Sequence, residues 1–364
     1  MQPYFSEVFG NPSSVHIYGQ KSETALEKAR REIAECLNAR PTEIIFTSCG
    51  SESDNLALRG AAFAARKNAG KNHLVISPIE HPAVHNTAMQ LQELHGFNLT
   101  WLPVTKTGLI EPEAVLESIQ EDTILVSVMS ANNEIGTINP IRKIGSICQE
   151  QGILFHTDAV QSGAHFPLDV EELQVDLLSL GAHKFYGPKG VGVLYVRSGT
   201  GMISPHTGGS QEFGLRAATQ NIPLIVGMAK AFQMVQEGYQ IRNKNILPLR
   251  DSLIKYVLSE IADCQLTGDP VERLPNHASF VFDQVDGNLL IQVLDATGFA
   301  CSSGSACKTG DPEPSKVLTR LGYSPSLALG SLRVTLGKST KKDEIEQFLE
   351  ILPGCVQKVR EVRK

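Results

Sequence analysis

The chain has 364 residues, of which 41% are hydrophobic and 20% charged, and its formal net charge is −6 with a pI near 6.0. A chain of this length and composition can bury a large core and is long enough for two globular domains. This acidity and the lack of a basic stripe exclude nucleic acid as the main partner, and no apolar run is long enough to cross a bilayer.

The first residues and the cysteines bear on the cellular location of the protein and on the kinds of site that it can contain. Residues 1–7 show no basic region followed by an apolar stretch, so we expect no secretory signal, no membrane partner and a cytoplasmic protein. The seven cysteines are scattered, without a Cys-x-x-Cys pair or a Cys/His metal spacing. We therefore expect no metal site, and free thiols of which one can react.

The first two thirds of the chain alternate between helices and strands. Ser22 can cap a helix whose apolar positions recur every three or four residues, from Leu26 to Leu37. The further elements expected in chain order are a strand at 43–47, a helix at 51–65, strands at 73–77 and 123–129, a helix at 141–151, and strands at 153–157, 175–180 and 192–196. This alternation predicts an α/β fold with a mostly parallel sheet covered on both faces.

The pattern changes after about residue 243. The expected elements there are a helix at 247–262, a strand at 278–282, a helix at 288–296, a strand at 332–336 and a helix at 341–359. Such a mixture predicts a smaller α+β domain. We expect residues 15–243 to form the large domain, and residues 1–14 with 244–364 to form the small one.

Lys184 follows an apolar run at 175–182 that predicts a buried strand. Most lysines lie on the surface, and a surface lysine on a loop is the alternative here. Yet His183 precedes it and a Gly/Pro-rich turn follows, which favours a functional amine. A desolvated lysine has a lowered pKa and can form a Schiff base with an aldehyde cofactor.

A second candidate is the segment 46–55, where an apolar strand, a small-residue turn and a helix start follow one another. Free backbone amides at such a helix start attract a phosphate, Gly50 allows close approach, and Ser51 can add a hydroxyl. The alternative is a plain N-cap at Ser51, which this segment alone favours. The segment matches neither nucleotide-binding glycine motif, so no nucleotide is implied.

Asp158 ends the apolar strand at 153–157, at the edge where α/β sheets bind ligands. A buried aspartate must be paired or protonated, and a protonated pyridine nitrogen would be a suitable partner that also strengthens the ring as an electron sink. The alternative is a structural aspartate that caps the next turn. The two interpretations are even for this residue alone, and the neighbouring motifs favour the cofactor.

Two further strand ends carry polar residues. His81 follows the strand at 73–77, where a histidine can stack on an aromatic cofactor and move protons, although a lone loop histidine is more often solvated or hydrogen-bonded. Asn132, Asn133 and Glu134 follow the strand at 123–129 and can recognise a ligand, although this pattern by itself favours a turn.

Five segments together resemble one family, the cysteine desulfurases, which are pyridoxal-phosphate enzymes with the aminotransferase class V fold. They occur in family order at 9–14 (FGNPSS), 47–53 (TSCGSES), 132–136 (NNEIG), 183–190 (HKFYGPKG) and 302–307 (SSGSAC). The last segment resembles the subgroup whose catalytic cysteine lies on an extended loop. The resemblance implies fold type I, similar to aspartate aminotransferase, with pyridoxal 5′-phosphate as cofactor.

The resemblance also implies roles for individual residues. Lys184 would hold the cofactor aldehyde, His81 would stack on the ring, and Asp158 would pair with the ring nitrogen. The residues implied near the ring hydroxyl are Gln161 and Asn133, and those implied at the phosphate are Gly50, Ser51 and His183. Thr219 matches a position that reaches the phosphate of a partner subunit, which implies a homodimer.

On the substrate side, Arg333 matches the residue that grips the carboxylate of L-cysteine, for which a bidentate fork is well suited. Without the family, Arg333 would be an arginine inside a strand, more readily explained by a salt bridge. The resemblance adds Asn11 and Asn133 as substrate contacts. It implies that Cys307 takes the sulfur as a persulfide, next to Lys308 and in a flexible Ser/Gly-rich segment, and that alanine is released.

Other cysteines have simpler explanations. The motif does not select Cys301, and Cys49 is expected to fill space in the phosphate turn. The remaining four, expected to be packing residues, are Cys36, Cys148, Cys264 and Cys355.

Two positions depart from the family pattern. Members commonly begin with a segment of the type Leu-Asp-Asn-Ala-Ala-Thr-Thr, whereas this chain starts at Met1-Gln-Pro-Tyr, from which we expect reduced stability and activity. Gly181 stands where a serine commonly helps to hold the phosphate, so one contact would be weaker.

Three alternatives stay open from the sequence: a selenocysteine lyase, a class V aminotransferase or β-lyase that does not need Cys307, and an inactive scaffold. The sulfur acceptor is not named by the sequence either. Iron–sulfur scaffold proteins and tRNA-thiolation carriers both fit the family.

Overall fold

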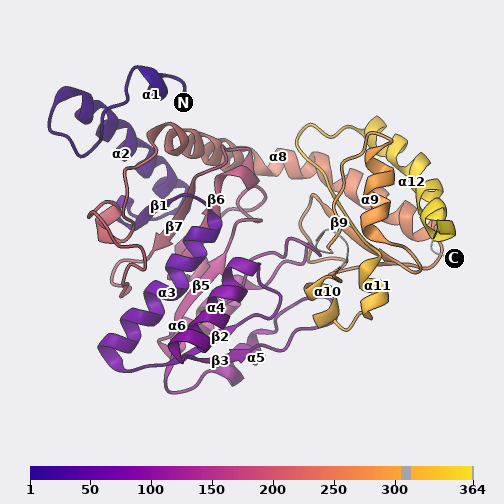
Figure 1. Cartoon of the computed structure of the whole chain (residues 1–364), viewed down its shortest axis with the longest axis horizontal. Helices are drawn as coiled ribbons and strands as arrows, with labels where there is room; N and C mark the ends of the chain where they lie inside the picture. The colour runs from indigo at the N-terminus through magenta and orange to yellow at the C-terminus, as the bar shows by residue number, and fades with distance from the viewer. Residues whose placement is uncertain (305–312, 363–364) are drawn as a thin grey trace. The chain divides into compact units, whose positions relative to one another are not determined.

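A computed structural model of the chain describes residues 1–304 and 313–362. By its internal contacts the chain divides into two compact units. The first unit contains Met1–Pro103, Ile110–Ser130 and Pro140–Tyr239, and the second contains Val104–Leu109, Ala131–Asn139 and Gln240–Lys364. Each unit has its own sheet (Figure 1).

The first unit is built on a seven-stranded sheet with the order β1-β7-β6-β5-β4-β2-β3. Its strands are β1 (Ile44–Thr47), β2 (His73–Ile76), β3 (Asn98–Trp101), β4 (Thr123–Ser127), β5 (Leu154–Asp158), β6 (Leu177–Gly181) and β7 (Gly192–Val196). The five neighbouring strands β6, β5, β4, β2 and β3 run parallel to one another, while β7 is antiparallel to both of its neighbours, β1 and β6. The predicted α/β fold with a mostly parallel sheet is therefore confirmed.

Helices that precede, connect and follow these strands belong to the same unit. They are α1 (Pro3–Ser6), α2 (Ile17–Leu37), α3 (Gly50–Ala69), α4 (Pro82–His95), α5 (Pro112–Ser118), α6 (Ile141–Gln151) and α7 (Val170–Leu173), followed by α8 (Ile222–Glu260), which continues into the second unit. Short 3-10 turns are η1 (Pro41–Glu43), η2 (Ala182–Phe185) and η3 (Glu212–Gly214). Helix α3 lies across the middle of the sheet, and its small residues Ala57, Ala61 and Ala62 let it approach closely (Figure 1).

The start of α2 differs from the prediction. Ser22 does not cap this helix, because the helix begins five residues earlier, at Ile17. His16 is the N-cap, and its Nδ1 accepts a hydrogen bond from the Gly19 amide at 3.2 Å. Ser22 is buried inside the helix, where its hydroxyl donates to the Val8 carbonyl. A serine that could cap a helix from its sequence context is thus used for a tertiary contact.

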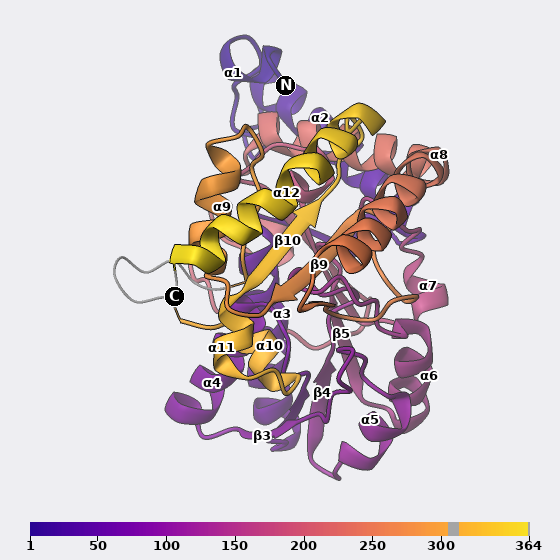
Figure 2. The ribbon, with the colours of Figure 1, turned by 90° about the vertical axis from the view of Figure 1, so that its right-hand side faces the viewer.

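The second unit is an α+β unit around a three-stranded antiparallel sheet with the order β10-β9-β8 (Figure 2). Its elements are β8 (Cys264–Leu266), β9 (His277–Phe282), α9 (Gly287–Asp295), α10 (Lys316–Arg320), α11 (Pro325–Leu329), β10 (Ser331–Thr335) and α12 (Lys342–Val362). The predicted helix at 247–262 is the second part of the 39-residue helix α8, which contains Pro248. A proline therefore did not end this helix, contrary to its usual effect.

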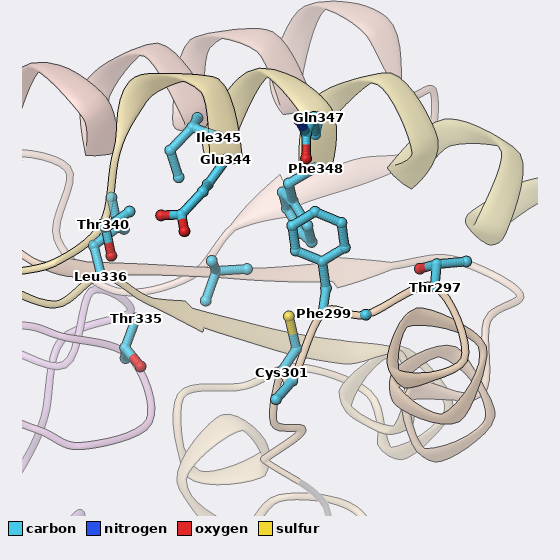
Figure 3. Close-up of a pocket in the computed structure, with 13 residues that line it drawn as sticks. Thr297, Phe299, Cys301, Thr335, Leu336, Thr340, Glu344, Ile345, Gln347 and Phe348 are labelled. Carbon is cyan, nitrogen blue, oxygen red and sulfur yellow. The ribbon is translucent and has the colours of Figure 1, made fainter.

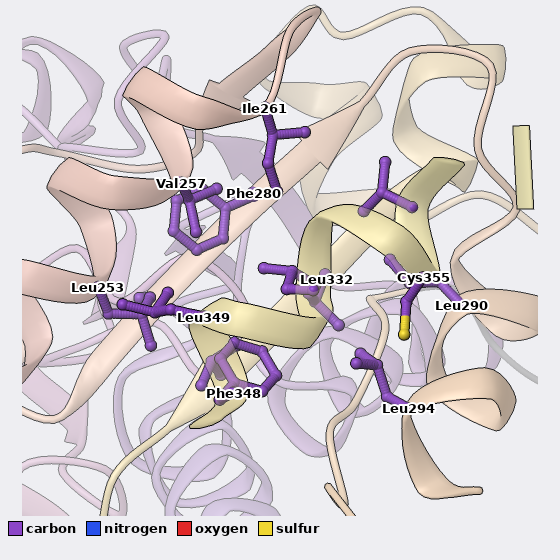
Figure 4. Packing of buried hydrophobic residues seen from close by; sticks show 14 of the residues in the cluster. Leu253, Val257, Ile261, Phe280, Leu290, Leu294, Leu332, Phe348, Leu349 and Cys355 are labelled. Carbon is purple, nitrogen blue, oxygen red and sulfur yellow. The ribbon is translucent and has the colours of Figure 1, made fainter. Parts of the chain in front are cut away.

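Buried side chains from α8, β9, β10, α9 and α12 form the core of the second unit (Figure 4). Phe280 and Leu332 come from the sheet, and Leu253 and Leu349 come from the two long helices. Burying each such side chain contributes about 1.5–3 kcal/mol before the cost of ordering the chain. Cys355 belongs to this cluster, which agrees with its predicted packing role.

The compact units place three segments differently from the expected domain boundaries. Residues 1–14 fall in the first unit, where Met1 lies against α8 at Gly227, and residues 104–109 and 131–139 fall in the second unit. The predicted boundaries between folding domains stay a prediction. Over the described residues, no helix is long and apolar enough to cross a membrane.

Candidate functional site

The carboxyl edge of the parallel strands brings Asp158 and Lys184 into one site. Asp158 is the last residue of β5, and Gly181 is the last residue of the adjacent strand β6. The turn η2 follows directly and carries His183 and Lys184. The carboxyl of Asp158 interacts electrostatically with both Lys184 and His81, so three of the predicted residues converge here.

Asp158 is only 5% exposed, and burial raises the pKa of its carboxyl. Three nearby groups oppose that effect: the Val160 amide, which donates to Oδ1 at 2.9 Å, and the side chains of His81 and Lys184. The residue thus caps the next turn, as one interpretation expected, and also faces positive charge. A carboxylate in such surroundings can hold a protonated ring nitrogen.

The N-terminus of α3 has the features of an anion site. Cys49 is the N-cap in an extended conformation, and its side chain makes no cap hydrogen bond. Ser51 lies in the first turn and is exposed, so the interpretation of Ser51 as a plain N-cap is wrong. The first amides of α3 are therefore not satisfied by a capping side chain, and the helix dipole adds positive potential there.

Two glycines keep this helix start close to the end of β6. A Cβ added to Gly50 would lie 2.7 Å from Cγ2 of Val160, which is too close for a real side chain. A Cβ on Gly181 would lie 3.4 Å from the amide nitrogen of Gly50. The small residue at 181 therefore leaves room beside the amides, at the position where the family pattern has a serine.

His81 is the N-cap of α4. Its Nδ1 accepts a hydrogen bond from the Ala83 amide at 3.1 Å, so a neutral ring carries its proton on Nε2. The half-buried ring lines a cavity of about 320 Å³ together with Ser51, Asn55 and Arg59. The predicted ring-stacking residue and the predicted phosphate residue thus line the same cavity.

Lys184 is more exposed than the sequence suggested. The apolar run ends at Ala182, and the 3-10 turn carries the lysine out of the buried register of β6, so that its side chain is exposed. The expected desolvation of this amine is therefore not observed. The pKa of neighbouring His183 is lowered by burial and by Lys184 and Lys189, which favours a neutral ring that can donate a hydrogen bond.

The remaining predicted residues of the first unit lie in loops. Gln161 follows β5 by three residues and is half-buried. Thr219 is exposed and follows Ala218, whose φ is +95°. Asn11 is exposed, and its Oδ1 accepts from the Ser13 amide at 2.9 Å.

In the second unit, Asn133 and Arg333 lie together. Asn132 forms the predicted turn, since its Oδ1 accepts from the amides of Glu134 and Ile135. The turn presents the carbonyl of Asn133 to Nη1 of Arg333 at 2.8 Å, with Arg333 in the middle of β10. Burial lowers the pKa of Arg333 and the nearby Glu134 carboxylate opposes that effect, so the guanidinium stays charged.

Cys307 lies outside the described residues, whereas Cys301 is described. Cys301 lines a cavity of about 390 Å³ whose walls include the rings of Phe299 and Phe348, which meet edge to face (Figure 3). Burial raises the pKa of the Cys301 thiol to about 11. This thiol is protonated at neutral pH and is a poor nucleophile, which agrees with the motif's selection of the other cysteine.

Two buried carboxyls near Asp158 were missed by sequence reasoning. Asp54 lies on α3 and Glu80 lies directly before His81, and both interact electrostatically with Asp158. Asp54 directly follows the motif at 47–53, and Glu80 directly precedes the predicted site residue His81. An acid inside an otherwise apolar helix face was the available signal for Asp54.

The class of protein follows from comparison with known families. The family model described as "Aminotransferase class-V" matches residues 1–348, and this family uses pyridoxal 5′-phosphate. "Cysteine desulfurase IscS" of Dictyoglomus turgidum is 45% identical over 100% of this chain and 91% of its own length. The protein of the same name from Methanosarcina thermophila is 46% identical over 99% of this chain and 88% of its own length.

Solved structures agree with these relatives. A "NifS-like protein" superposes with a TM-score of 0.90 at 35% identity, covering 98% of this chain and 94% of its own. "SspA in complex with cysteine" superposes with a TM-score of 0.80 at 36% identity, covering 92% of this chain and 93% of its own. The chain therefore belongs to the cysteine desulfurases of the aminotransferase class-V family, and it is a pyridoxal-phosphate-dependent enzyme.

The residues present fit this cofactor. The buried carboxyl of Asp158 is a suitable partner for a cationic ring nitrogen, and the α3 amides beside Gly50 form a cradle that a Cβ would fill. Across the described residues, no group of three or more His, Cys, Asp or Glu side chains could hold a metal ion.

Proposed function

We propose that this cysteine desulfurase releases alanine from L-cysteine and keeps the sulfur on Cys307, with the site residues in the roles that follow. The observation that carries the proposal is the pairing of Asp158 and Lys184 at the ends of neighbouring strands, beside an open helix N-terminus. Pyridoxal phosphate has one group that suits each of these three features: its ring nitrogen suits Asp158, its aldehyde suits Lys184, and its phosphate suits the helix N-terminus.

The proposed cofactor contacts divide by the part of the cofactor that they hold. Lys184 binds the aldehyde carbon through its amine, Asp158 pairs with the ring nitrogen, and His81 covers the ring face. The residues proposed at the phosphate are Gly50, Ser51 and His183, and those proposed at the ring hydroxyl are Gln161 and Asn133. When bound, pyridoxal phosphate supplies an electron sink for the carbon skeleton of the amino acid.

Substrate binding is proposed to rest on Arg333. Its guanidinium is already oriented by the Asn133 carbonyl at Nη1, and its other donors suit a carboxylate. Asn133 and Asn11 are proposed as further contacts. L-Cysteine is the natural choice of substrate, because the relatives are named cysteine desulfurases and the solved structure of SspA contains cysteine.

Proton transfers are assigned to two side chains. The Lys184 amine would take the Cα proton of the substrate. His81 carries its ring proton on Nε2 when neutral, because Nδ1 accepts the Ala83 amide, and so it can pass a proton to the substrate or its leaving sulfur. Both residues interact electrostatically with the carboxyl of Asp158.

Sulfur transfer is proposed to use Cys307 as the nucleophile. Its thiolate attacks the substrate sulfur, so that an S–S bond forms while the C–S bond breaks, and the Cβ carbon takes a proton to give alanine. Neighbouring Lys308 favours the thiolate form. The persulfide is then passed to an acceptor protein, proposed to be an iron–sulfur scaffold or a thiolation carrier in the cytoplasm.

A homodimer is proposed from Thr219. Its exposed side chain, held after the left-handed Ala218, suits a contact with the phosphate of a partner subunit. The match of the surrounding sequence to the family supports the same contact.

Mass spectrometry of the protein after exposure to L-cysteine tests the proposal. We expect one added sulfur on the peptide that contains Cys307. Cys307→Ser should lose this sulfur and keep the bound cofactor, whereas Cys301→Ser is the matched control and should keep both. Added sulfur on the Cys301 peptide, with none at Cys307, would overturn the assignment.

A further inference from the structure

A cluster of three buried carboxyls lies under the cofactor site. Asp158 ends β5, Asp54 lies on α3, and Glu80 follows β2. Asp54 and Glu80 are 1% and 5% exposed, and each of the three interacts electrostatically with another member of the set. The proposed mechanism gives a role to Asp158 and none to Asp54 or Glu80.

Among the described residues, the groups that act most strongly on the carboxyl of Asp54 include other acids and a serine but no cation. Its Oδ1 is buried without a hydrogen-bond partner, and the nearest ring nitrogen, Nε2 of His156, is 3.7 Å away. Ser179 contributes a hydrogen bond to the carboxyl. The groups that face Asp54 are therefore acids (Asp158 and Glu80), the Cys49 thiol, a serine and a histidine.

That histidine is neutral. His156 is fully buried on β5, and both ring nitrogens bond serine hydroxyls: Nδ1 to Ser127 at 2.9 Å and Nε2 to Ser179 at 3.0 Å. Burial lowers the pKa of His156 to about 3, so its ring is uncharged at neutral pH. The short contact between Asp54 and His156 is therefore not an ion pair at neutral pH.

Glu80 is in a similar position. Its Oε1 accepts the Met129 amide at 2.6 Å, but Oε2 is buried without a hydrogen-bond partner. Asp158 differs from both acids, because the side chains of Lys184 and His81 and the Val160 amide all act to lower the pKa of its carboxyl. Among the three acids, Asp158 thus has the surroundings that best stabilise a negative charge.

We propose that Asp54 and Glu80 are positioning residues held as neutral acids, so that the negative charge of this cluster resides on Asp158. Adjacent buried carboxylates do not ionise together, because their repulsion adds to the cost of burial. If Asp54 or Glu80 took the charge, Asp158 would be protonated and could not pair with a cationic ring nitrogen. The inference rests on the proposed role of Asp158 and deepens it.

The burial that raises the pKa of Asp54 and of Glu80 well above their ordinary values agrees with this arrangement. The unpartnered oxygens Oδ1 of Asp54 and Oε2 of Glu80 are the atoms at which a proton would remove the unfavourable charge. An ordinary aspartate or glutamate is ionised above about pH 5, so a neutral carboxyl at pH 8 is a distinctive state.

Infrared difference spectra of the full chain at pH 8 test the proposal, comparing wild type with Asp54→Asn and with Glu80→Gln. Each variant should lose a protonated-carboxyl C=O band and no carboxylate band. Glu346→Gln, at an exposed salt bridge on α12, is the matched control and should lose a carboxylate band. Loss of a carboxylate band in Asp54→Asn or Glu80→Gln would overturn the proposal for that residue, and either variant suffices if the other fails to fold.

The coupling to Asp158 provides a second measurement. Asp158→Asn removes the neighbouring charge, so the pH at which the Asp54 band disappears should fall by about one unit or more. An unchanged midpoint would contradict the localisation of charge on Asp158. Asp54→Asn and Glu80→Gln should change the dissociation constant for pyridoxal phosphate by no more than about threefold, because amides reproduce neutral acids of the same shape.

The spectra are recorded with and without pyridoxal phosphate, which separates the two hypotheses. Protein that shows both acid bands but never binds the cofactor would contradict the proposed function and leave the neutral acids in place. Protein that binds the cofactor but shows carboxylates at positions 54 and 80 would contradict this inference alone.

Discussion

At the scale of single residues, the proposed functional side chains of each unit differ in how strongly the fold constrains them. Asp158 is buried and held by the Val160 amide, whereas Lys184 is exposed and sits on a short turn. A fixed acid beside a movable amine suits chemistry in which the lysine must leave and return. Arg333 is constrained by its strand and by the Asn133 carbonyl.

Arg333→Ala should raise KM for L-cysteine by about a hundredfold or more, because a charge-assisted contact to the substrate carboxylate is lost. Cofactor absorbance should be unchanged. Steady-state kinetics with cofactor titration will measure both effects, and Arg320→Ala, at an exposed arginine on α10, is the control. Equal loss of cofactor in the Arg333 variant would show a structural role instead.

His156 predicts a pH dependence of stability. Its folded-state pKa of about 3 lies below the ordinary 6.5, so the unfolded chain binds more protons between these values. Its contribution is therefore fully present above pH 6.5 and is lost as the pH falls toward 3. Lowering the pH from 7 to 4 should cost on the order of 3 kcal/mol through this residue.

His156→Gln should flatten that dependence. Urea unfolding at several pH values, followed by the fluorescence of Trp101 on β3, reports on the first unit, and Trp101 is the single tryptophan of the chain. His206→Gln, at an exposed loop position, should leave the wild-type slope. An identical slope in His156→Gln would mean that another group controls the acid sensitivity.

At the scale of elements, a buried ion pair connects the turn η3 to helix α2 and strand β1. Arg30 binds Glu212 through Nη1 at 2.8 Å and Nη2 at 2.9 Å, and the two side chains are 3% and 1% exposed. Glu212 also accepts the Phe46 amide at 2.9 Å. This pair fixes the backbone that leads toward Thr219.

Glu212→Gln should destabilise the protein by about 3–5 kcal/mol, because the buried Arg30 loses its buried carboxylate partner and keeps the Glu27 contact at Nε. The exposed pair Lys28–Glu32 on the same helix provides the contrast, and Lys28→Ala should cost less than about 0.5 kcal/mol. Urea unfolding gives both values. A small cost for Glu212→Gln would show that water or a rearranged neighbour satisfies Arg30.

At the scale of the whole molecule, each unit has its own sheet and hydrophobic core, and helix α8 belongs to both. The cofactor contacts proposed for the first unit come from three strand ends and two helix starts. Such a site forms only when the sheet is folded, so its ligand binds the native state and not the unfolded chain.

Pyridoxal phosphate should therefore raise the unfolding midpoint recorded from Trp101. At a hundredfold excess over Kd the expected stabilisation is about 2.7 kcal/mol. Lys184→Ala should show a smaller increase, because covalent attachment is lost while the Asp158 and phosphate contacts stay. Thermal unfolding of both proteins over a range of cofactor concentrations measures the difference, and equal shifts would exclude a bond at this lysine.

The sequence alone determined the order of most elements and indicated candidate residues for the cofactor site. Local apolar periodicity predicts strands such as β7 and helices such as α6. The positions at which apolar runs end identify candidate strand-end residues such as Asp158 and Lys184. The family segments added candidate residues for binding the substrate.

The tertiary structure decided what local patterns cannot encode. The cap of α2, the continuity of α8 past Pro248, the exposure of Lys184 and the antiparallel placement of β7 depend on neighbours that are distant in the chain. The same holds for Asp54, Glu80 and Asp158, which stand far apart in sequence. Burial and Coulomb interactions act through space, so only the folded chain reveals that these acids share one charge environment.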